Sequence, residues 1–124
     1  MKHHLYLQIA SKLRTKILRG DYAPEQQIPS IRRLAENEKC NPATVQKAMK
    51  VLEEQNLVTS CGTLGYFVIA SEQEIKEIRY QESNKLVKIL FEKLGELGFS
   101  EDEIVNLFFR KDAVSYTHLR AHET

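Results

Sequence analysis

No stretch of this 124-residue chain stays apolar for the roughly 20 residues that a membrane-spanning helix requires. The opening residues, MKHHLYLQIASKLR, become amphipathic at once and contain no apolar signal-peptide region. These absences predict a cytoplasmic protein with no membrane partner. With 42% apolar residues, the chain can bury one good core and a small appendage.

Cysteine is scarce as well. The two cysteines, Cys40 and Cys61, lie far apart and show neither Cys-x-x-Cys nor Cys/His ligand spacing. His3 and His4 are adjacent, but no carboxylate or thiol is positioned to complete a metal site with them. The sequence therefore predicts reduced structural thiols, no disulfide framework and no bound metal.

The motifs of catalysis are also missing. The chain contains no glycine-rich phosphate loop, no nucleophile elbow and no paired carboxylates with a second positioned group. We therefore expect a protein that is not an enzyme, has no catalytic residue and needs no cofactor.

The net charge of +1 hides an uneven distribution along the chain. Residues 1–69 carry ten Lys and Arg against six Asp and Glu, whereas residues 70–124 carry eight against eleven. A basic half beside an acidic half suggests a head that binds a polyanion and a tail with another role. Charge alone does not distinguish DNA from RNA or an acidic protein, so the motifs must decide.

Apolar spacing predicts three helices in the basic half. The first has Leu5, Ile9, Leu13 and Ile17 at steps of four and ends at Gly20. A connection with two prolines follows, DYAPEQQIP at 21–29, from which Ile28 is expected to enter the core.

The second helix begins after the capping residue Ser30 and ends near Asn37. The third begins at Asn41-Pro42, and its apolar face is formed by Val45, Ala48, Met49 and Leu52. Two helices joined by so short a turn predict a helix-turn-helix.

A β-hairpin is predicted directly after the third helix. Residues 57–60 and 66–69 are two short β-prone segments, and CGTLG at 61–65 is the turn between them. The predicted fold is therefore mainly α with a small β-hairpin, a winged helix-turn-helix domain at residues 1–70.

A helical hairpin is predicted for residues 71–113. A long charged helix starts after Ser71, Gly98 ends it, and Ser100 with Glu103 forms a capping box for the next helix. One narrow apolar stripe needs a partner, and we expect a second copy of the chain to supply it. The residues expected at this dimer interface are Ile75, Ile78, Leu86, Leu90, Leu94, Leu97, Ile104, Leu107 and Phe108.

Residues 114–124 show no sustained period, no helix cap and no evident partner for their apolar side chains. They resemble translated cloning-adapter tails, and we interpret them as a non-native or disordered tail without a function.

Four phrases within residues 6–68 match one family in order and spacing. They are ILRG at 17–20, IPSIRRLA at 28–35, NPATVQKA at 41–48 and GYFV at 65–68. In these phrases the chain resembles the DNA-binding domain of the GntR superfamily of bacterial regulators. The Asn-Pro-x-Thr-Val opening, followed by only two helices, resembles the YtrA subfamily in particular. That resemblance implies a small dimeric repressor, often linked to a transporter operon.

The predicted DNA contacts lie on the outer face of the third helix, near its N-terminus. Gln46 is expected to read an adenine edge with its amide, and Thr44 to contact a phosphate or a thymine methyl. Arg32 on the second helix is carried over from the matching arginine of the family. Wings of this family are commonly rich in Arg or Lys, whereas residues 61–65 have neither. The wing of this chain is therefore expected to contact DNA through its backbone and shape, or only weakly. The full predicted set is Arg32, Ala43, Thr44, Gln46, Lys47, Lys50 and Gly65.

The function expected from these features is sequence-specific regulation of transcription, as a homodimeric repressor of a transporter or stress-related operon that binds double-stranded operator DNA. Two alternatives stay open. The weakly basic wing also fits a winged-helix module that docks on a protein, and the helical hairpin could enclose a small-molecule effector of unidentified chemistry.

Overall fold

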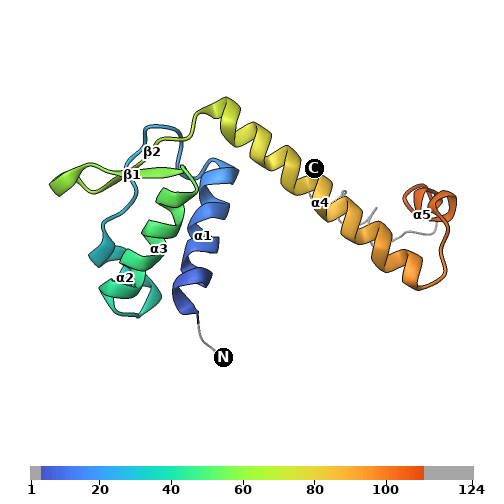
Figure 1. The fold of residues 1–124 in the computed structure, drawn as a ribbon, viewed down its shortest axis with the longest axis horizontal. Coiled ribbons are helices and arrows are strands. Elements are labelled where there is room, and N and C mark those ends of the chain that lie inside the picture. The colour runs from blue at the N-terminus through green and yellow to red at the C-terminus, as the bar shows by residue number, and fades with distance from the viewer. Residues whose placement is uncertain (1–3, 111–124) are drawn as a thin grey trace. The chain divides into compact units, whose positions relative to one another are not determined.

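The computed structural model describes residues 4–110, so His3 and the tail predicted from residue 114 lie outside the described part. The elements are α1 (Leu5–Arg19), α2 (Ile31–Glu38), α3 (Pro42–Glu54), β1 (Val58–Ser60), a 3-10 turn (Gly62–Leu64), β2 (Tyr66–Val68), α4 (Glu72–Glu96) and α5 (Glu101–Leu107) (Figure 1). The predicted fold class, mainly helical with one β-hairpin, is confirmed. The chain divides into two compact units, one that ends at Tyr80 and one that begins at Gln81.

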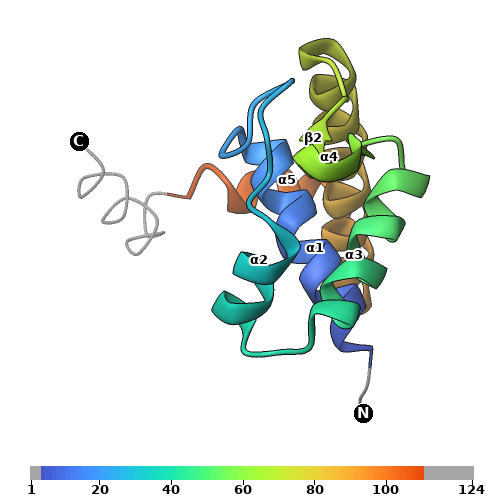
Figure 2. The same cartoon turned by 90° about the vertical axis from the view of Figure 1, so that its left-hand side faces the viewer.

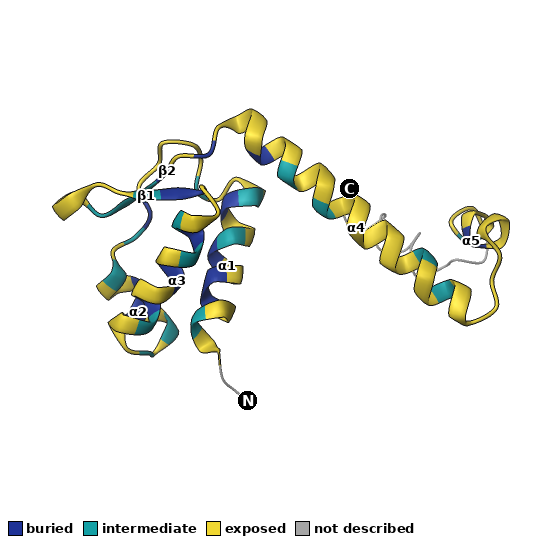
Figure 3. Ribbon diagram, in the orientation of Figure 1, coloured by how far each residue is buried: buried dark blue, intermediate teal, exposed yellow. Residues whose placement is uncertain are grey.

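The core of the N-terminal unit lies where α3 packs against both α1 and α2. Figure 2 shows these three helices as one cluster, and Figure 3 shows the dark, buried stripes of α1 and α3. The stripes follow the apolar spacing of the sequence except at Leu5, which is exposed at the start of α1. Their buried residues are Ile9, Ala10, Leu13 and Ile17 on α1, and Val45, Ala48, Met49 and Leu52 on α3. Burial of these side chains is the main favourable term in folding of this unit.

The wing is an antiparallel hairpin in which Val58 faces Val68 and Ser60 faces Tyr66. The connection between α1 and α2 adds to it, because the Ile28 N–H donates to the Tyr66 carbonyl at 2.9 Å and the Val68 N–H donates to the Gln26 carbonyl at 3.0 Å. Ile28 is buried, as expected from the sequence. The connection is therefore an ordered edge of the wing.

Helix α4 begins inside the N-terminal unit. Ser71 and Glu74 form a reciprocal cap: the Ser71 N–H donates to Glu74 Oε1 at 2.8 Å, and the Glu74 N–H donates to Ser71 Oγ at 3.0 Å. Hydrogen bonding by the Ser71 backbone N–H, and next by the Ser71 side chain, lowers the pKa of the Glu74 carboxyl. One turn of α4 then adds Ile75 to the core and packs Ile78 against it. The core thus continues past residue 70, where the sequence analysis placed the boundary.

The C-terminal unit keeps much of its apolar surface exposed. The capping box of Ser100 and Glu103 starts α5 as predicted, and Ile104 is buried. The large exposed apolar side chains of this unit are Leu86, Val87, Ile89, Leu90, Leu97, Phe99, Val105, Phe108 and Phe109. Within residues 4–110, no helix has the length and apolar character of a membrane span.

Leu52 tests the core because its side chain is 0% exposed, whereas Leu64 is 65% exposed on the wing. Leu52→Ala should lower the free energy of unfolding by about 2–5 kcal/mol, since the deleted atoms leave a cavity. Leu64→Ala, the same change at the surface, should alter it by less than about 0.5 kcal/mol. Urea unfolding of both variants measures the difference. Equal losses would contradict the assigned core.

Candidate nucleic-acid interface

The start of α3 is held in place by its caps. The Asn41 Oδ1 accepts a hydrogen bond from the Ala43 N–H at 2.8 Å, and Pro42 occupies the first turn. The turn before it is equally ordered, since Lys39 adopts a left-handed conformation with φ of 55° and the Cys40 N–H donates to the Ala35 carbonyl at 3.0 Å. The first turn of α3 therefore has a defined position next to α2.

The outer face of α3 brings together most of the predicted contacts. Ala43, Gln46, Lys47 and Lys50 follow the i, i+3, i+4, i+7 spacing of one helical face, and all four are exposed. Thr44 is half-buried at the edge of this face. We call Ala43, Thr44, Gln46, Lys47 and Lys50 the α3 face. It carries two positive charges and no negative charge.

Lys47 is positioned by an aromatic residue that sequence reasoning missed. Its Nζ lies 5.8 Å from the centre of the Tyr6 ring, within the range of a cation–π contact. Tyr6 belongs to the first turn of α1 and also packs against the core. The sequence signal was weak, because one aromatic residue beside an apolar stripe usually indicates packing alone.

Arg32 lies apart from the α3 face, beside the N-terminus of α3. It lines an open hollow of about 540 Å³ together with Glu36, Lys39, Asn41 and Pro42. The positive end of a helix dipole and two cationic side chains favour an anion at this place, whereas the carboxylate of Glu36 opposes it. Lys39 is a further residue that the sequence analysis did not select. The sequence signal for Lys39 was its position as a basic residue in the turn between α2 and α3.

Gly65 lies in the wing turn with φ of 96° and ψ of −152°, a backbone conformation in which a residue with a side chain would be strained. Its carbonyl accepts a hydrogen bond from the Cys61 N–H at 2.7 Å, and the Gln27 side chain donates to the neighbouring Leu64 carbonyl. Burial, and next the charge of Glu53, raise the pKa of the nearby Tyr66 hydroxyl. No charged residue occurs between positions 58 and 70. The wing therefore offers no charged side chain, whereas the α3 face carries two lysines.

Residues 5–68 match the family described as bacterial regulatory proteins, gntR family. The chain belongs to the GntR family. The HTH-type transcriptional regulator YhcF of Bacillus subtilis is 25% identical over 101 residues, which cover 82% of this chain and 84% of YhcF. A crystallised GntR-family regulator from Bacteroides thetaiotaomicron is 32% identical, with a TM-score of 0.62 over 85% of this chain and 93% of that one. This GntR protein is therefore a DNA-binding regulator of transcription and not an enzyme.

The GntR match also includes a structure solved with DNA. The DNA-binding domain of AraR, in complex with operator ORX1, is 29% identical, with a TM-score of 0.52 over 55% of this chain and 81% of that domain. Residues 5–68, which the family matches, form the winged helix-turn-helix that carries the α3 face.

The residues predicted for dimerisation separate into three groups in this GntR protein. Leu86, Leu90, Leu97 and Phe108 are exposed, while Leu94 and Leu107 are half-buried. Ile75 packs in the core of the N-terminal unit, Ile78 packs against that core, and Ile104 is buried within the chain. Intrachain packing occupies these three isoleucines, so we keep only the first two groups as candidates for an interface between copies.

Loss of the cap at Asn41 should loosen the start of α3. Asn41→Ala removes the acceptor for the Ala43 N–H, which should cost about 1 kcal/mol and speed amide exchange at Ala43 and Thr44. Ser100→Ala removes a cap from α5 instead and should leave those two amides unchanged. Amide hydrogen exchange followed by NMR measures both variants. Faster exchange over all of α3 in Asn41→Ala would indicate general unfolding and contradict a local cap.

Proposed function

We propose that this GntR protein is a homodimeric repressor that reads a near-palindromic operator with the α3 faces of two copies. The observation that carries the proposal is the α3 face itself, an exposed stripe with two lysines and no carboxylate on a fixed helix. The AraR domain, which resembles this part of the chain, was crystallised on operator DNA. A related use of α3 in this chain follows by analogy.

Base reading is assigned to Gln46, and backbone binding to the cations around it. The Gln46 amide can donate to and accept from the N6 and N7 edge of adenine at once. Lys47, Lys50 and Arg32 supply phosphate contacts, and Thr44 contacts a phosphate or a thymine methyl. Gly65 brings the wing backbone to the DNA without a charged side chain.

The C-terminal end of α3 limits how the helix can enter the major groove. Glu53 and Glu54 stand there, and their negative charges would repel phosphates if the entire helix lay along the groove. Insertion by the N-terminal turns avoids this repulsion. The hollow lined by Arg32, Glu36 and Lys39, in which cations outnumber carboxylates, then faces the phosphate backbone at the same end of α3.

Dimerisation is assigned to the exposed apolar residues of α4 and α5. Leu86 and Leu90 are one helical turn apart on α4, and Leu97 is exposed in the turn that follows this helix. An exposed apolar surface of this kind marks an interaction site in a water-soluble domain. A single head has few cations, so two linked heads gain affinity through effective concentration.

The operon under control is proposed to encode a transporter or a stress response. This assignment rests on the likeness to the YtrA subfamily, in which the DNA-binding domain is followed by short helices only. α4 and α5 match that description within residues 4–110.

A second candidate function is docking of the winged helix on a protein. The absence of charge between positions 58 and 70 favours it, because a DNA-binding wing commonly uses basic residues against phosphates. DNA binding that is absent, or insensitive to salt, would favour this candidate.

Selection of genomic fragments by the full chain should recover a site with two-fold symmetry. Gln46→Ala should then lose discrimination at one base pair per half-site, at a cost of about 1–3 kcal/mol, while Arg32→Ala should weaken all sequences alike and reduce the salt slope by about one per head. Gln81→Ala, the same substitution on exposed α4, is the control. Band-shift titrations at several salt concentrations measure these effects. Unchanged discrimination in Gln46→Ala would refute its role in base reading.

Charges placed on the exposed apolar residues of α4 should separate the two copies. Leu86→Glu with Leu90→Glu should shift sedimentation from dimer to monomer, because burying two unpaired carboxylates at an interface is unfavourable. Operator affinity should fall at least about tenfold with it. Gln81→Glu with Asn84→Glu adds the same charge at other exposed positions of α4 and should keep the dimer. A wild-type chain that sediments as a monomer on its own and on DNA would overturn the dimer proposal.

A further inference from the structure

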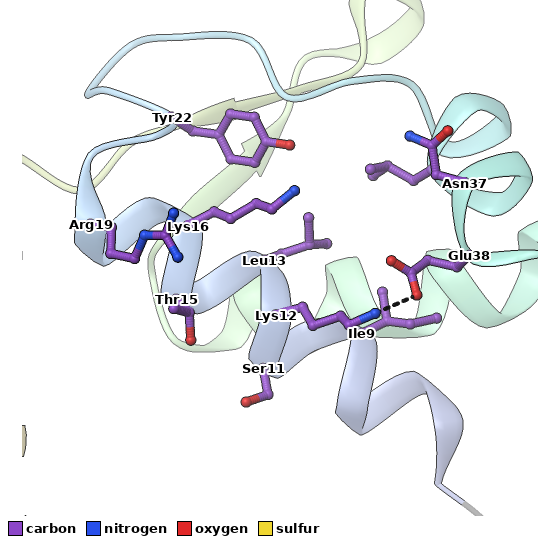
Figure 4. A pocket seen from close by; sticks show the side chains of 11 residues that line it. Ile9, Ser11, Lys12, Leu13, Thr15, Lys16, Arg19, Tyr22, Asn37 and Glu38 are labelled. Atoms are coloured by element: carbon purple, nitrogen blue, oxygen red, sulfur yellow. Dashed lines mark hydrogen bonds and ion pairs between the residues drawn. The ribbon is translucent and has the colours of Figure 1, made fainter.

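A hollow of about 370 Å³ opens between α1 and α2 (Figure 4). It exists because α3 packs against both helices, while α1 and α2 make few contacts with each other. We call it the α1–α2 hollow. Its volume falls within the range of small-molecule sites, roughly 300–1,000 Å³. None of its lining residues belongs to the set proposed for DNA contact or to the exposed apolar residues of α4.

The inner wall of the α1–α2 hollow is apolar. Ile9 and Leu13 of α1 and Leu34 of α2 line it, and each is also part of the buried core. These side chains are only 2–6% exposed, so the wall offers dispersion contact to the apolar body of a ligand rather than a large gain from removing water. An inorganic ion alone would leave this wall unused.

Polar groups stand across the mouth of the hollow. In Figure 4 the side chains of Lys16 and Tyr22 extend next to each other toward its middle, and Asn37 lies on the opposite wall. The Lys16 Nζ lies 5.9 Å from the centre of the Tyr22 ring. An ammonium, a phenol hydroxyl and an amide can all donate hydrogen bonds to one acidic group.

The charge of Lys16 distinguishes it from the other two cations of the hollow. Lys12 pairs with Glu38 at 2.9 Å, and Arg19 pairs with Asp21 at 3.0 Å. No carboxylate of residues 4–110 forms an ion pair with Lys16. The hollow therefore keeps one positive charge that its own carboxylates leave unneutralised.

We propose that the α1–α2 hollow binds a small organic anion, an apolar ring or branched chain that carries a phosphate or carboxylate. Lys16, Tyr22 and Asn37 hold the acidic group, and Ile9, Leu13 and Leu34 contact the apolar body. The ligand would connect α1 to α2. This location differs from the effector site between α4 and α5 that the sequence suggested.

Titration of the ¹⁵N-labelled full chain with phenyl phosphate tests the site by NMR. Saturable shifts should be confined to amides around the hollow, and Lys16→Gln should weaken binding about tenfold. Lys88→Gln removes the same charge from exposed α4 and should bind normally. Inorganic phosphate should bind more weakly at the same amides. Equal affinity for both probes would overturn the role of the apolar wall.

A variant that is expected to tighten binding separates an effect on the ligand from a loss of structure. Glu38→Gln releases Lys12 from its ion pair and makes the hollow more positive, so phenyl phosphate should bind about threefold more tightly. Shifts that spread over all basic surfaces without saturation would refute the site. Equal weakening by Lys16→Gln and Lys88→Gln, or no tightening in Glu38→Gln, would do the same. These outcomes are independent of operator binding.

Discussion

The packing of α3 between α1 and α2 is the constraint on which the rest of the N-terminal unit depends. Val45, Ala48, Met49 and Leu52 are 0–1% exposed, so one side of α3 cannot turn away from the core. Because a helix repeats every 3.6 residues, fixing that side also fixes the α3 face toward solvent. The same packing separates α1 from α2 and so produces the α1–α2 hollow. The core, the orientation of the α3 face and the hollow are thus consequences of one buried stripe.

Charge then selects which part of that fixed surface can meet DNA. The N-terminal half of α3 is flanked by Arg32 and Lys39, whereas Glu53 and Glu54 mark its other end. The wing adds no charge, so the Coulomb attraction of one head is small and is reduced further by salt. Linking two heads is the physical remedy open to such a chain. The nine large apolar side chains exposed among residues 81–110 are consistent with it, because an exposed apolar surface in a water-soluble domain marks an interaction site.

Local signals predicted most of the fold. Ser30, Asn41 and Ser100 each accept the backbone hydrogen bond expected of a cap, and the apolar spacing of α1 and α3 located the core. What the sequence could not supply was the partner of each apolar face. The stripe of α4 was continuous in the sequence, yet Ile75 packs in the N-terminal core while Leu86 stays exposed. Tyr6 beside Lys47 and the α1–α2 hollow depend on segments distant in sequence, which periodicity does not report.

Helix α4 therefore has two roles along one unbroken element. Its first turn completes the N-terminal core through Ile75, and its later turns expose the residues assigned to dimerisation, with neither Gly nor Pro before Gly95 to interrupt it. The Ser71–Glu74 cap that starts the helix thus supports both. Hydrogen bonds lower the pKa of Glu74 below its ordinary value. At any pH above that ordinary value, the ionised carboxylate therefore stabilises the cap in full. As pH falls through the lowered pKa, this contribution is lost. The first turn of α4 thereby gains part of its anchoring from one exposed carboxylate, which is ionised at neutral pH.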